Sequence, residues 1–217
     1  MTNFIVFISL FTISFVTYSQ QLSKSQVNDI VWEQFSSSNA LTFNEITKSG
    51  NFAGCELVYR YIYRDYRGRE GEPVILVGSL TSNYIKGKAF SLFLKVQPQV
   101  LELIGNSAQL KSIPIHFATL KIGSNNLDKF RVSKFACEGG GYCAGYASPK
   151  PDFMEATLSK FPIDPDIYIT LTPNGIDSRF KLSDIKDNGI KPTSLMDKFT
   201  ACVAKVLEEQ LKDLEKR

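Results

Sequence analysis

The fold is decided by residues 55–64, which read CELVYRYIYR. Along this segment, apolar or aromatic residues at odd positions alternate with mostly charged residues at even positions. Because successive side chains of a strand point to opposite faces of a sheet, this period of two predicts a long β-strand. One face of that strand carries the aromatic residues, which favour β-structure, and the other face carries most of the charge.

The residues that follow predict two further strands next to the first. Gly68 and Gly71 mark a turn, residues 74–80 read as a second strand, and apolar residues alternate again from Phe90 to Val96. Short connections between three consecutive strands predict an antiparallel meander.

Two hairpins are expected further along the chain. The first pairs residues 113–117 with residues 130–137 across a turn at 123–126. The second pairs residues 167–171 with residues 180–182 across a Pro-Asn-Gly turn. Asn-Gly tolerates the positive φ that a tight hairpin turn requires, so the second turn is the clearer of the two.

Helices are expected on both sides of this β-rich region, with Ser25 and Ser194 as N-caps, and a shorter one at residues 152–161. The last helix has apolar residues every three or four positions, which predicts one face packed on the sheet. This stripe consists of Leu195, Phe199, Cys202, Val206, Leu207, Leu211 and Leu214. The alternative is a helix that makes contacts with another subunit.

Together these patterns predict one α+β domain over residues 20–217. We expect a mostly antiparallel β-sheet made of a meander plus hairpins, with a sandwich as one arrangement of the strands. A short N-terminal helix and a long C-terminal helix pack on this sheet.

The first segment predicts export. Residues 1–19 carry no charged side chain, and residues 4–16 are almost continuously apolar. This run is shorter than the ~20 residues that a membrane-spanning helix needs, and it is typical of a signal peptide. Thr17 and Ser19 place small residues where a signal peptidase reads, so we expect cleavage after Ser19. No Lys or Arg precedes the apolar run, which leaves an uncleaved anchor or a buried strand as alternatives. The expected product is a periplasmic or secreted bacterial protein without a transmembrane segment.

Four cysteines in an exported chain predict two disulfides, with three pairings available to them. Cys137 and Cys143 flank three consecutive glycines, which let the backbone turn sharply enough for the two sulfurs to meet. We therefore expect Cys137–Cys143, and by elimination Cys55–Cys202. A reactive dithiol is the alternative, although the two-residue spacing of thioredoxin-type motifs is absent.

Several kinds of chemistry lack their sequence signatures. The chain has 25 Lys+Arg, 22 Asp+Glu and one His, so its net charge of +3 gives no reason to expect a nucleic-acid partner. Phosphate-binding, dinucleotide-binding and nucleophile-elbow motifs do not occur, and we expect no cofactor, metal or catalytic residue. His116 reads as an ordinary strand residue. A hydrolase that acts on cell-wall or extracellular polymer through paired carboxylates is the alternative, with Glu56, Asp65, Glu70, Glu72 and Glu138 as candidates.

Two segments rich in Tyr, Arg and Gly suggest a binding surface. Tyrosine offers flat amphipathic area, and arginine offers a planar fork that matches carboxylates and phosphates. The candidate residues are Tyr59, Arg60, Tyr61, Arg64, Arg67 and Arg69 on the first strand and its turn, with Tyr142 and Tyr146 beside the Gly-rich loop. Alternatively, the tyrosines belong to the core and the arginines to the solvated face. We expect a non-catalytic binding module for a protein or glycan ligand; a structural subunit of an envelope assembly is a second alternative.

Overall fold

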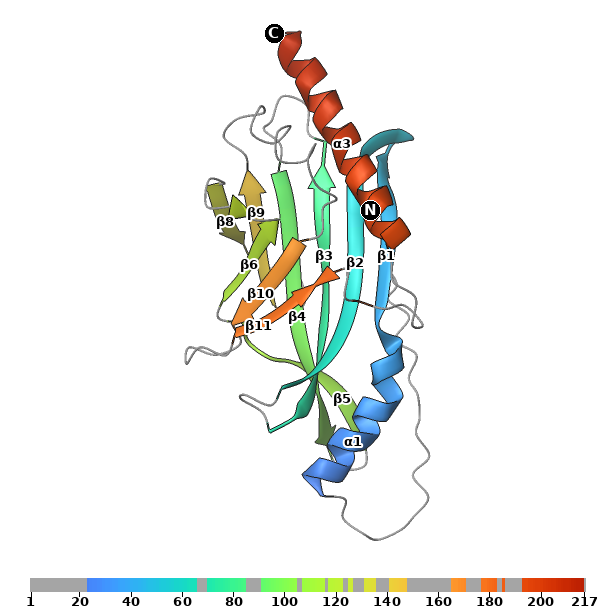
Figure 1. Ribbon diagram of the computed structural model, residues 1–217, viewed down its shortest axis with the longest axis vertical. Helices are drawn as coiled ribbons and strands as arrows, with labels where there is room; N and C mark the ends of the chain where they lie inside the picture. Colours follow the sequence, from blue (N-terminus) through green and yellow to red (C-terminus); the bar gives the residue numbers. More distant parts are fainter. Residues whose placement is uncertain are drawn as a thin grey trace.

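The computed structural model describes residues 23–65, 70–84, 91–104, 107–115, 117–122, 125–126, 131–135, 141–147, 165–170, 177–182, 185 and 193–216. Within these residues it confirms the α+β class and the mostly antiparallel sheet (Figure 1). The predicted signal peptide, the helix at residues 152–161, residues 123–124 of the first hairpin's turn and His116 lie outside the described residues.

The described strands form two antiparallel sheets. The larger sheet has seven strands in the order β1-β2-β3-β4-β9-β8, with β5 also paired to β4, and the smaller has the order β11-β10-β6-β7. The strands are β1 (Ala40–Lys48), β2 (Asn51–Asp65), β3 (Glu72–Asn83), β4 (Ser91–Ile104), β5 (Ser107–Ser112), β6 (Phe117–Ile122), β7 (Asn125–Asn126), β8 (Arg131–Phe135), β9 (Tyr142–Ala147), β10 (Pro165–Thr170) and β11 (Asp177–Lys181). The helices are α1 (Lys24–Phe35), the 3₁₀-helix η1 (Ser36–Ser38) and α3 (Thr193–Glu215).

The alternation in residues 55–64 produces the expected meander of β2, β3 and β4. Leu57 is in register with Leu80 of β3, which is in register with Leu94 of β4, and all three are at most 1% exposed. We call the face that carries these leucines the core face and the opposite one the outer face. Burial of each such side chain contributes about 1.5–3 kcal/mol to folding.

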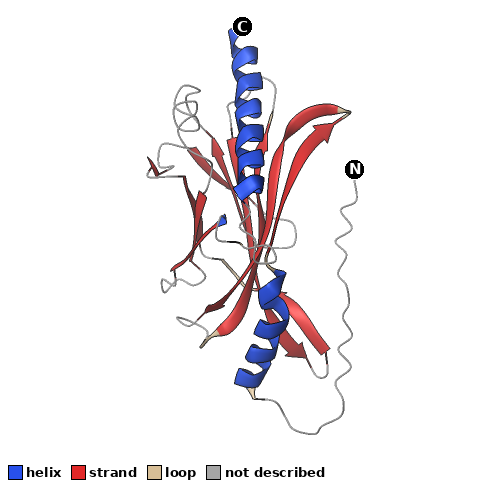
Figure 2. Cartoon of the chain, turned by 45° about the vertical axis from the view of Figure 1, so that its right-hand side comes forward, coloured by secondary structure: helices blue, strands red, loops and turns tan. Residues whose placement is uncertain are grey.

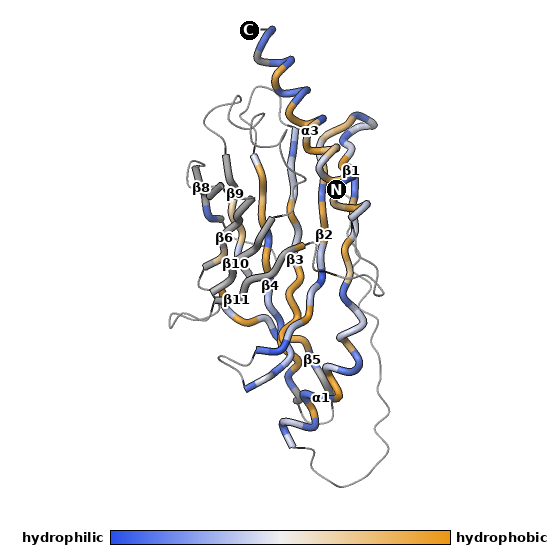
Figure 3. Tube along the Cα trace, in the orientation of Figure 1, coloured by the Kyte–Doolittle hydropathy of each residue, from blue (hydrophilic) through white to orange (hydrophobic). Residues whose placement is uncertain are grey.

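Two layers cover the core face. Phe199, Val203 and Val206 of α3 belong to the same buried cluster as Leu57 and Leu80. Residues along α3 alternate between hydrophobic and hydrophilic, as expected of a helix that buries one stripe (Figure 3). The smaller sheet lies over the other part of this face (Figures 1 and 2), where Ala118 of β6 joins the cluster. On the outer face, α1 lies against one end of the sheet, where its Asp29 and Trp32 contact Arg64 of β2.

One hydrogen bond ties the last turns of α3 to the residue that follows β3. The Tyr84 hydroxyl, just after β3, donates to Asp213 Oδ2 at 2.5 Å, and this hydrogen bond raises the pKa of Tyr84. Gln210 is only 6% exposed, and neither atom of its amide has a hydrogen-bond partner among the described residues. None of the described helices combines the length and the apolar character needed to cross a membrane.

Three local predictions were wrong. The N-cap of α1 is Ser23, whose side chain and that of Gln26 form a reciprocal capping box, so Ser25 lies inside the helix. Helix α3 begins at Thr193, which places Ser194 inside its first turn. Among the described residues, the two arms of the hairpin predicted from residues 113–117 and 130–137 do not pair with each other, because β6 pairs with β10 and, across the predicted turn, with β7 in the small sheet, while β8 pairs with β9 in the large one.

The second predicted hairpin is confirmed by the pairing of β10 with β11. Strand β1 was not predicted. The alternation of its side chains between the two faces extends over few residues, because the register with β2 shifts between Ile46 and Thr47. Such a bulge interrupts the period of two on which strand recognition depends.

Candidate functional site

The pairing of Cys55 with Cys202 is confirmed. The two residues are 147 positions apart in sequence, their sulfurs are bonded at 2.06 Å, and the bond joins β2 to α3. Cys55 is 0% and Cys202 5% exposed, so the bridge forms part of the packing between helix and sheet. Cys143 is also disulfide-bonded. Its predicted partner, Cys137, lies outside the described residues, so that pairing stays a prediction.

The tyrosines predicted for a binding surface lie on the core face. Tyr59 is 1% exposed, and its hydroxyl donates to the backbone oxygen of Lys95 at 2.9 Å. Burial strongly raises the pKa of this hydroxyl. Its ring covers Gly78, the residue opposite on β3, where a Cβ atom would collide with the ring and with the Lys95 oxygen. Tyr61 is half-buried and stacks on Tyr63, with ring centroids 6.2 Å apart.

The predicted arginines of β2 lie on the outer face and hold the N-terminal elements. Arg60 Nε donates to the backbone oxygen of Ser38 at 2.6 Å. Arg64 forms an ion pair with Asp29 of α1 at 2.9 Å, and its guanidinium carbon lies 5.0 Å from the centre of the Trp32 ring. These contacts occupy both arginines within the chain.

Tyr142 is buried as well. It is 8% exposed, its pKa is raised mainly by burial, and Lys134 Nζ lies 5.4 Å from its ring centre. Arg67, Arg69 and the side chain of Tyr146 lie outside the description. The structure therefore does not bring the described members of the predicted surface together: the tyrosines lie on the core face, and Arg60 and Arg64 lie on the other.

The described candidate carboxylates fall into two groups: Glu56 lies within β2, whereas Asp65, the exposed Glu70 and Glu72 lie at the β2–β3 hairpin. Glu56 and Asp65 are on opposite faces of β2 and nine residues apart, which corresponds to roughly 30 Å along a strand. Glycoside hydrolysis needs two carboxylates within about 9.5 Å of each other. Asp65 and Glu72 are opposite each other at the end of the hairpin, but Asp65 is 3% exposed and is not open to a polymer. Glu138 lies outside the described residues.

A groove between α3 and β1, which the sequence did not predict, is the candidate site. Its volume is about 560 Å³, and it is shallow and widely open to solvent. On the β1 side, the exposed Glu45 lines one wall and the half-buried Phe43 forms the floor. The other wall is a stripe of α3 in which residues recur at helical spacing: Lys198, Ala201, Cys202 and Lys205. We call this site the α3–β1 groove.

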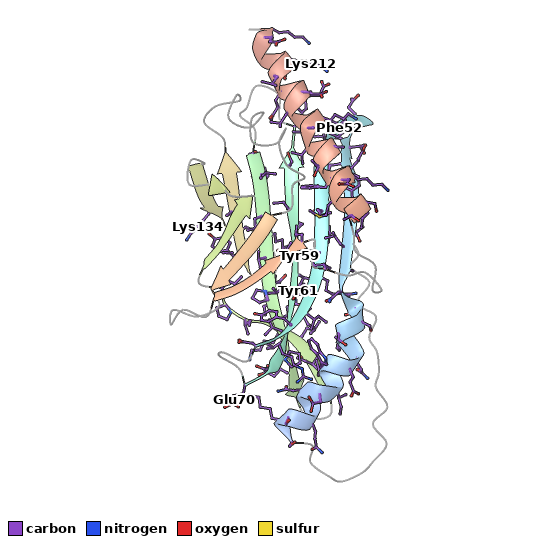
Figure 4. All side chains as sticks on the ribbon, in the orientation of Figure 1. Phe52, Tyr59, Tyr61, Glu70, Lys134 and Lys212 are labelled. Atoms are coloured by element: carbon purple, nitrogen blue, oxygen red, sulfur yellow. A yellow bond between two sulfur atoms is a disulfide. The ribbon has the colours of Figure 1, made fainter. Side chains whose placement is uncertain are left out.

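The groove has an apolar floor and an excess of positive charge above it. Phe43 is half-buried against the core, whereas Lys198, Lys205 and Glu45 are exposed. Lys205 Nζ lies 4.1 Å from the centre of the Phe52 ring, which packs beside α3 (Figure 4). Neither lysine forms an ion pair with any residue that the structure describes.

The disulfide fixes the two walls of the groove to each other. Glu45 is directly opposite Cys55 in the β1–β2 ladder, and Cys55 is bonded to Cys202 on the helical wall. The spacing of Lys198, Cys202 and Lys205 places them on one helical stripe, which the sequence does reveal. The opposite wall depends on β1, whose position no local pattern gives.

A free strand edge lies next to the groove. Within the described part of the chain, β1 pairs only with β2, so its other edge carries no strand. The first turns of α3 lie over β1 (Figure 1), which brings the helical wall close to this edge.

The leucines proposed for a contact between subunits give no second site. Leu211 is half-buried, and the side chain of Leu214 is not described.

Comparisons with models of protein families, with curated proteins and with solved structures give no match for this chain.

Proposed function

We propose that the protein is a non-catalytic binding protein of an oxidising compartment outside the cytoplasm, and that the α3–β1 groove is its binding surface. The observation that carries the proposal is the solvent-excluded Cys55–Cys202 bridge, which connects residues 147 positions apart. Disulfides of this structural kind persist in exported proteins and are rare in the reducing cytosol. The apolar segment at residues 4–16 supports the same location.

The rigidity of the groove supports binding as its role. A surface that is already fixed in shape loses little conformational entropy when a ligand binds, which increases affinity. Here the disulfide holds the helical wall to the ladder position that carries Glu45. The apolar floor supplies area to bury, and the lysines supply orientation for a polar partner.

The carboxylates give less support to catalysis. Glu56 and Asp65 are too far apart to act on one bond, and Asp65 is buried. A binding role requires no such pair.

The location of the protein is tested by purifying it from the cells that naturally produce it, and by determining its N-terminus and its free thiols. We expect a shortened N-terminus and no thiol that can be alkylated before reduction. Full-length protein in the cytosol with four reactive thiols would contradict the proposal.

The binding surface is tested by selecting random peptides on a display library. Wild-type protein is compared with Lys198→Glu/Lys205→Glu, and with Lys111→Glu/Lys216→Glu as a control of equal charge change at exposed sites away from the groove. We expect the selection to enrich peptides that bind the wild type and the control but do not bind the groove variant. Equal enrichment on all three proteins would contradict a role for the groove.

A further inference from the structure

We infer that the partner is an extended acidic polypeptide segment, which adds to the outer edge of β1 as an extra strand and directs its carboxylates toward Lys198 and Lys205. The inference rests on the proposed function, because it takes the α3–β1 groove as the binding surface.

The backbone of β1 is able to accept another strand. In an antiparallel ladder, alternate residues direct their N–H and C=O groups to one neighbour and the intervening residues direct theirs to the other side. Strand β1 has a described partner only in β2. Its outward groups are therefore a template for main-chain hydrogen bonds with an extended peptide.

The first seven residues of β1 lack the usual protection of an edge. Natural edges are blocked by Lys, Pro or bulges. In β1 the bulge lies at Ile46/Thr47 and Lys48 follows it, so residues 40–46 form a regular ladder with Glu45 as their one charge.

Where β1 has not yet begun, the exposed edge of the sheet belongs to β2, and a side chain blocks it there. Strand β2 continues past the start of β1, and there the side chain of Asn39 accepts a hydrogen bond from the Ile62 N–H at 2.9 Å. A side chain thus takes the place of a strand where α1 and η1 adjoin β2. No described side chain does this along residues 40–46.

The groove selects the side chains of the added strand. Side chains of a strand alternate between faces, so every second residue of the segment would face α3. These residues would meet the floor at Phe43 and the ammonium groups of Lys198 and Lys205, which have no described carboxylate partner. Two cations against the single Glu45 favour an acidic segment over a basic one.

The probe is a synthetic nine-residue peptide in which Glu alternates with Val, matched to the nine residues of β1. Binding to the intact, oxidised protein is measured by fluorescence anisotropy. We expect binding that weakens as salt is added, because the charges involved are exposed. Lys198→Glu/Lys205→Glu should weaken it about tenfold or more, whereas Lys111→Glu/Lys216→Glu should retain it. Glu45→Gln should strengthen it a few-fold.

Backbone methylation tests strand addition directly. Two further peptides carry N-methyl groups at odd or at even positions only. Because only alternate residues of an added strand bond to its neighbour, one methylated peptide should lose binding and the other retain it. Amide hydrogen exchange in residues 40–46 should slow when the unmethylated peptide binds.

The outcomes separate the two proposals. Equal binding of both methylated peptides would overturn strand addition and leave the groove as a binding surface. A library that yields only basic or neutral peptides dependent on Lys198 and Lys205 would overturn the acidic partner alone. Failure of the acidic peptide, together with a library selection that ignores the groove, would overturn both.

Discussion

Removal of the Cys55–Cys202 bridge should be the most damaging change that leaves every secondary-structure element intact. The perturbation is Cys55→Ala/Cys202→Ala, made in a Cys137→Ala/Cys143→Ala background so that one bridge alone is compared. The bond closes a loop of 147 residues. In the chain-entropy description, loss of a closure of that length destabilises the folded state by about 5 kcal/mol.

The packing around the bridge reduces the loss of stability that we expect. Phe199, Val203 and Val206 hold α3 to the sheet without the disulfide, so the helix should remain docked once folded. Engineered and native bridges often contribute less than chain entropy predicts, and we expect a loss of about 3–5 kcal/mol in the free energy of unfolding.

The assay is urea unfolding followed by two signals. Trp32 is the one tryptophan of the chain and lies in α1, and far-ultraviolet circular dichroism reports on α3. The single-bridge parent, fully reduced, is the matched control, since it lacks the bond but keeps both sulfur atoms in the core. Reduced parent and double variant should unfold at similar urea concentrations, well below the oxidised parent. A loss under about 1 kcal/mol would refute the reasoning that this bridge fixes α3 and the groove.

Four further changes have defined outcomes. Tyr59→Phe should cost about 1 kcal/mol at neutral pH through its lost hydrogen bond. Above pH 10 the unfolded chain releases the proton of Tyr59, whereas the folded protein keeps it because burial raises the pKa. The free energy of unfolding of the wild type therefore falls by about 1.4 kcal/mol per pH unit. Urea midpoints measured against pH should decline less steeply in Tyr59→Phe. Gly78→Ala should lower the midpoint by the equivalent of at least about 2 kcal/mol, and an unchanged midpoint would disprove the close approach of the tyrosine ring. Arg64→Leu should shift the emission of Trp32 to longer wavelength and cost about 0.5–1.5 kcal/mol; unchanged emission would contradict the observed stacking. Gln210→Leu should raise the free energy of unfolding by about 1 kcal/mol, and a decrease would mean that its amide has a partner.

The parts of the fold that were predicted correctly have local signals. The period of two in residues 55–64 identified β2, the Asn-Gly turn identified the β10–β11 hairpin, and the apolar stripe identified α3. The Cys55–Cys202 disulfide was predicted by elimination. The three glycines between Cys137 and Cys143 favour a bond between those two residues, so the remaining cysteines pair with each other.

The parts that were missed depend on contacts between distant residues. The sequence favours a hairpin between β6 and β8, because the two segments are close in sequence. Instead β6 pairs with β10 in the small sheet, and this sheet buries Ala118 against the core face. Alternation indicated that Tyr59 and Arg60 point to opposite faces, and the described tyrosines follow the alternative in which they belong to the core. The contact by which Arg60 holds η1 emerged only with the whole structure.

The candidate site was half visible in the sequence. Lys198, Cys202 and Lys205 form a helical stripe that can be read directly, but the wall opposite them comes from residues more than 150 positions earlier. Such a groove is created by tertiary contact alone.

The position of α3 constrains how the polypeptide is made. The leucines of β2 and β3 stay uncovered until residues 193–207 have left the ribosome, because those residues cover them in the finished protein. Contacts of such long range form slowly, and a nascent chain that lacks α3 cannot complete this core. Synthesis of the chain and closure of its hydrophobic interior are thereby separated in time.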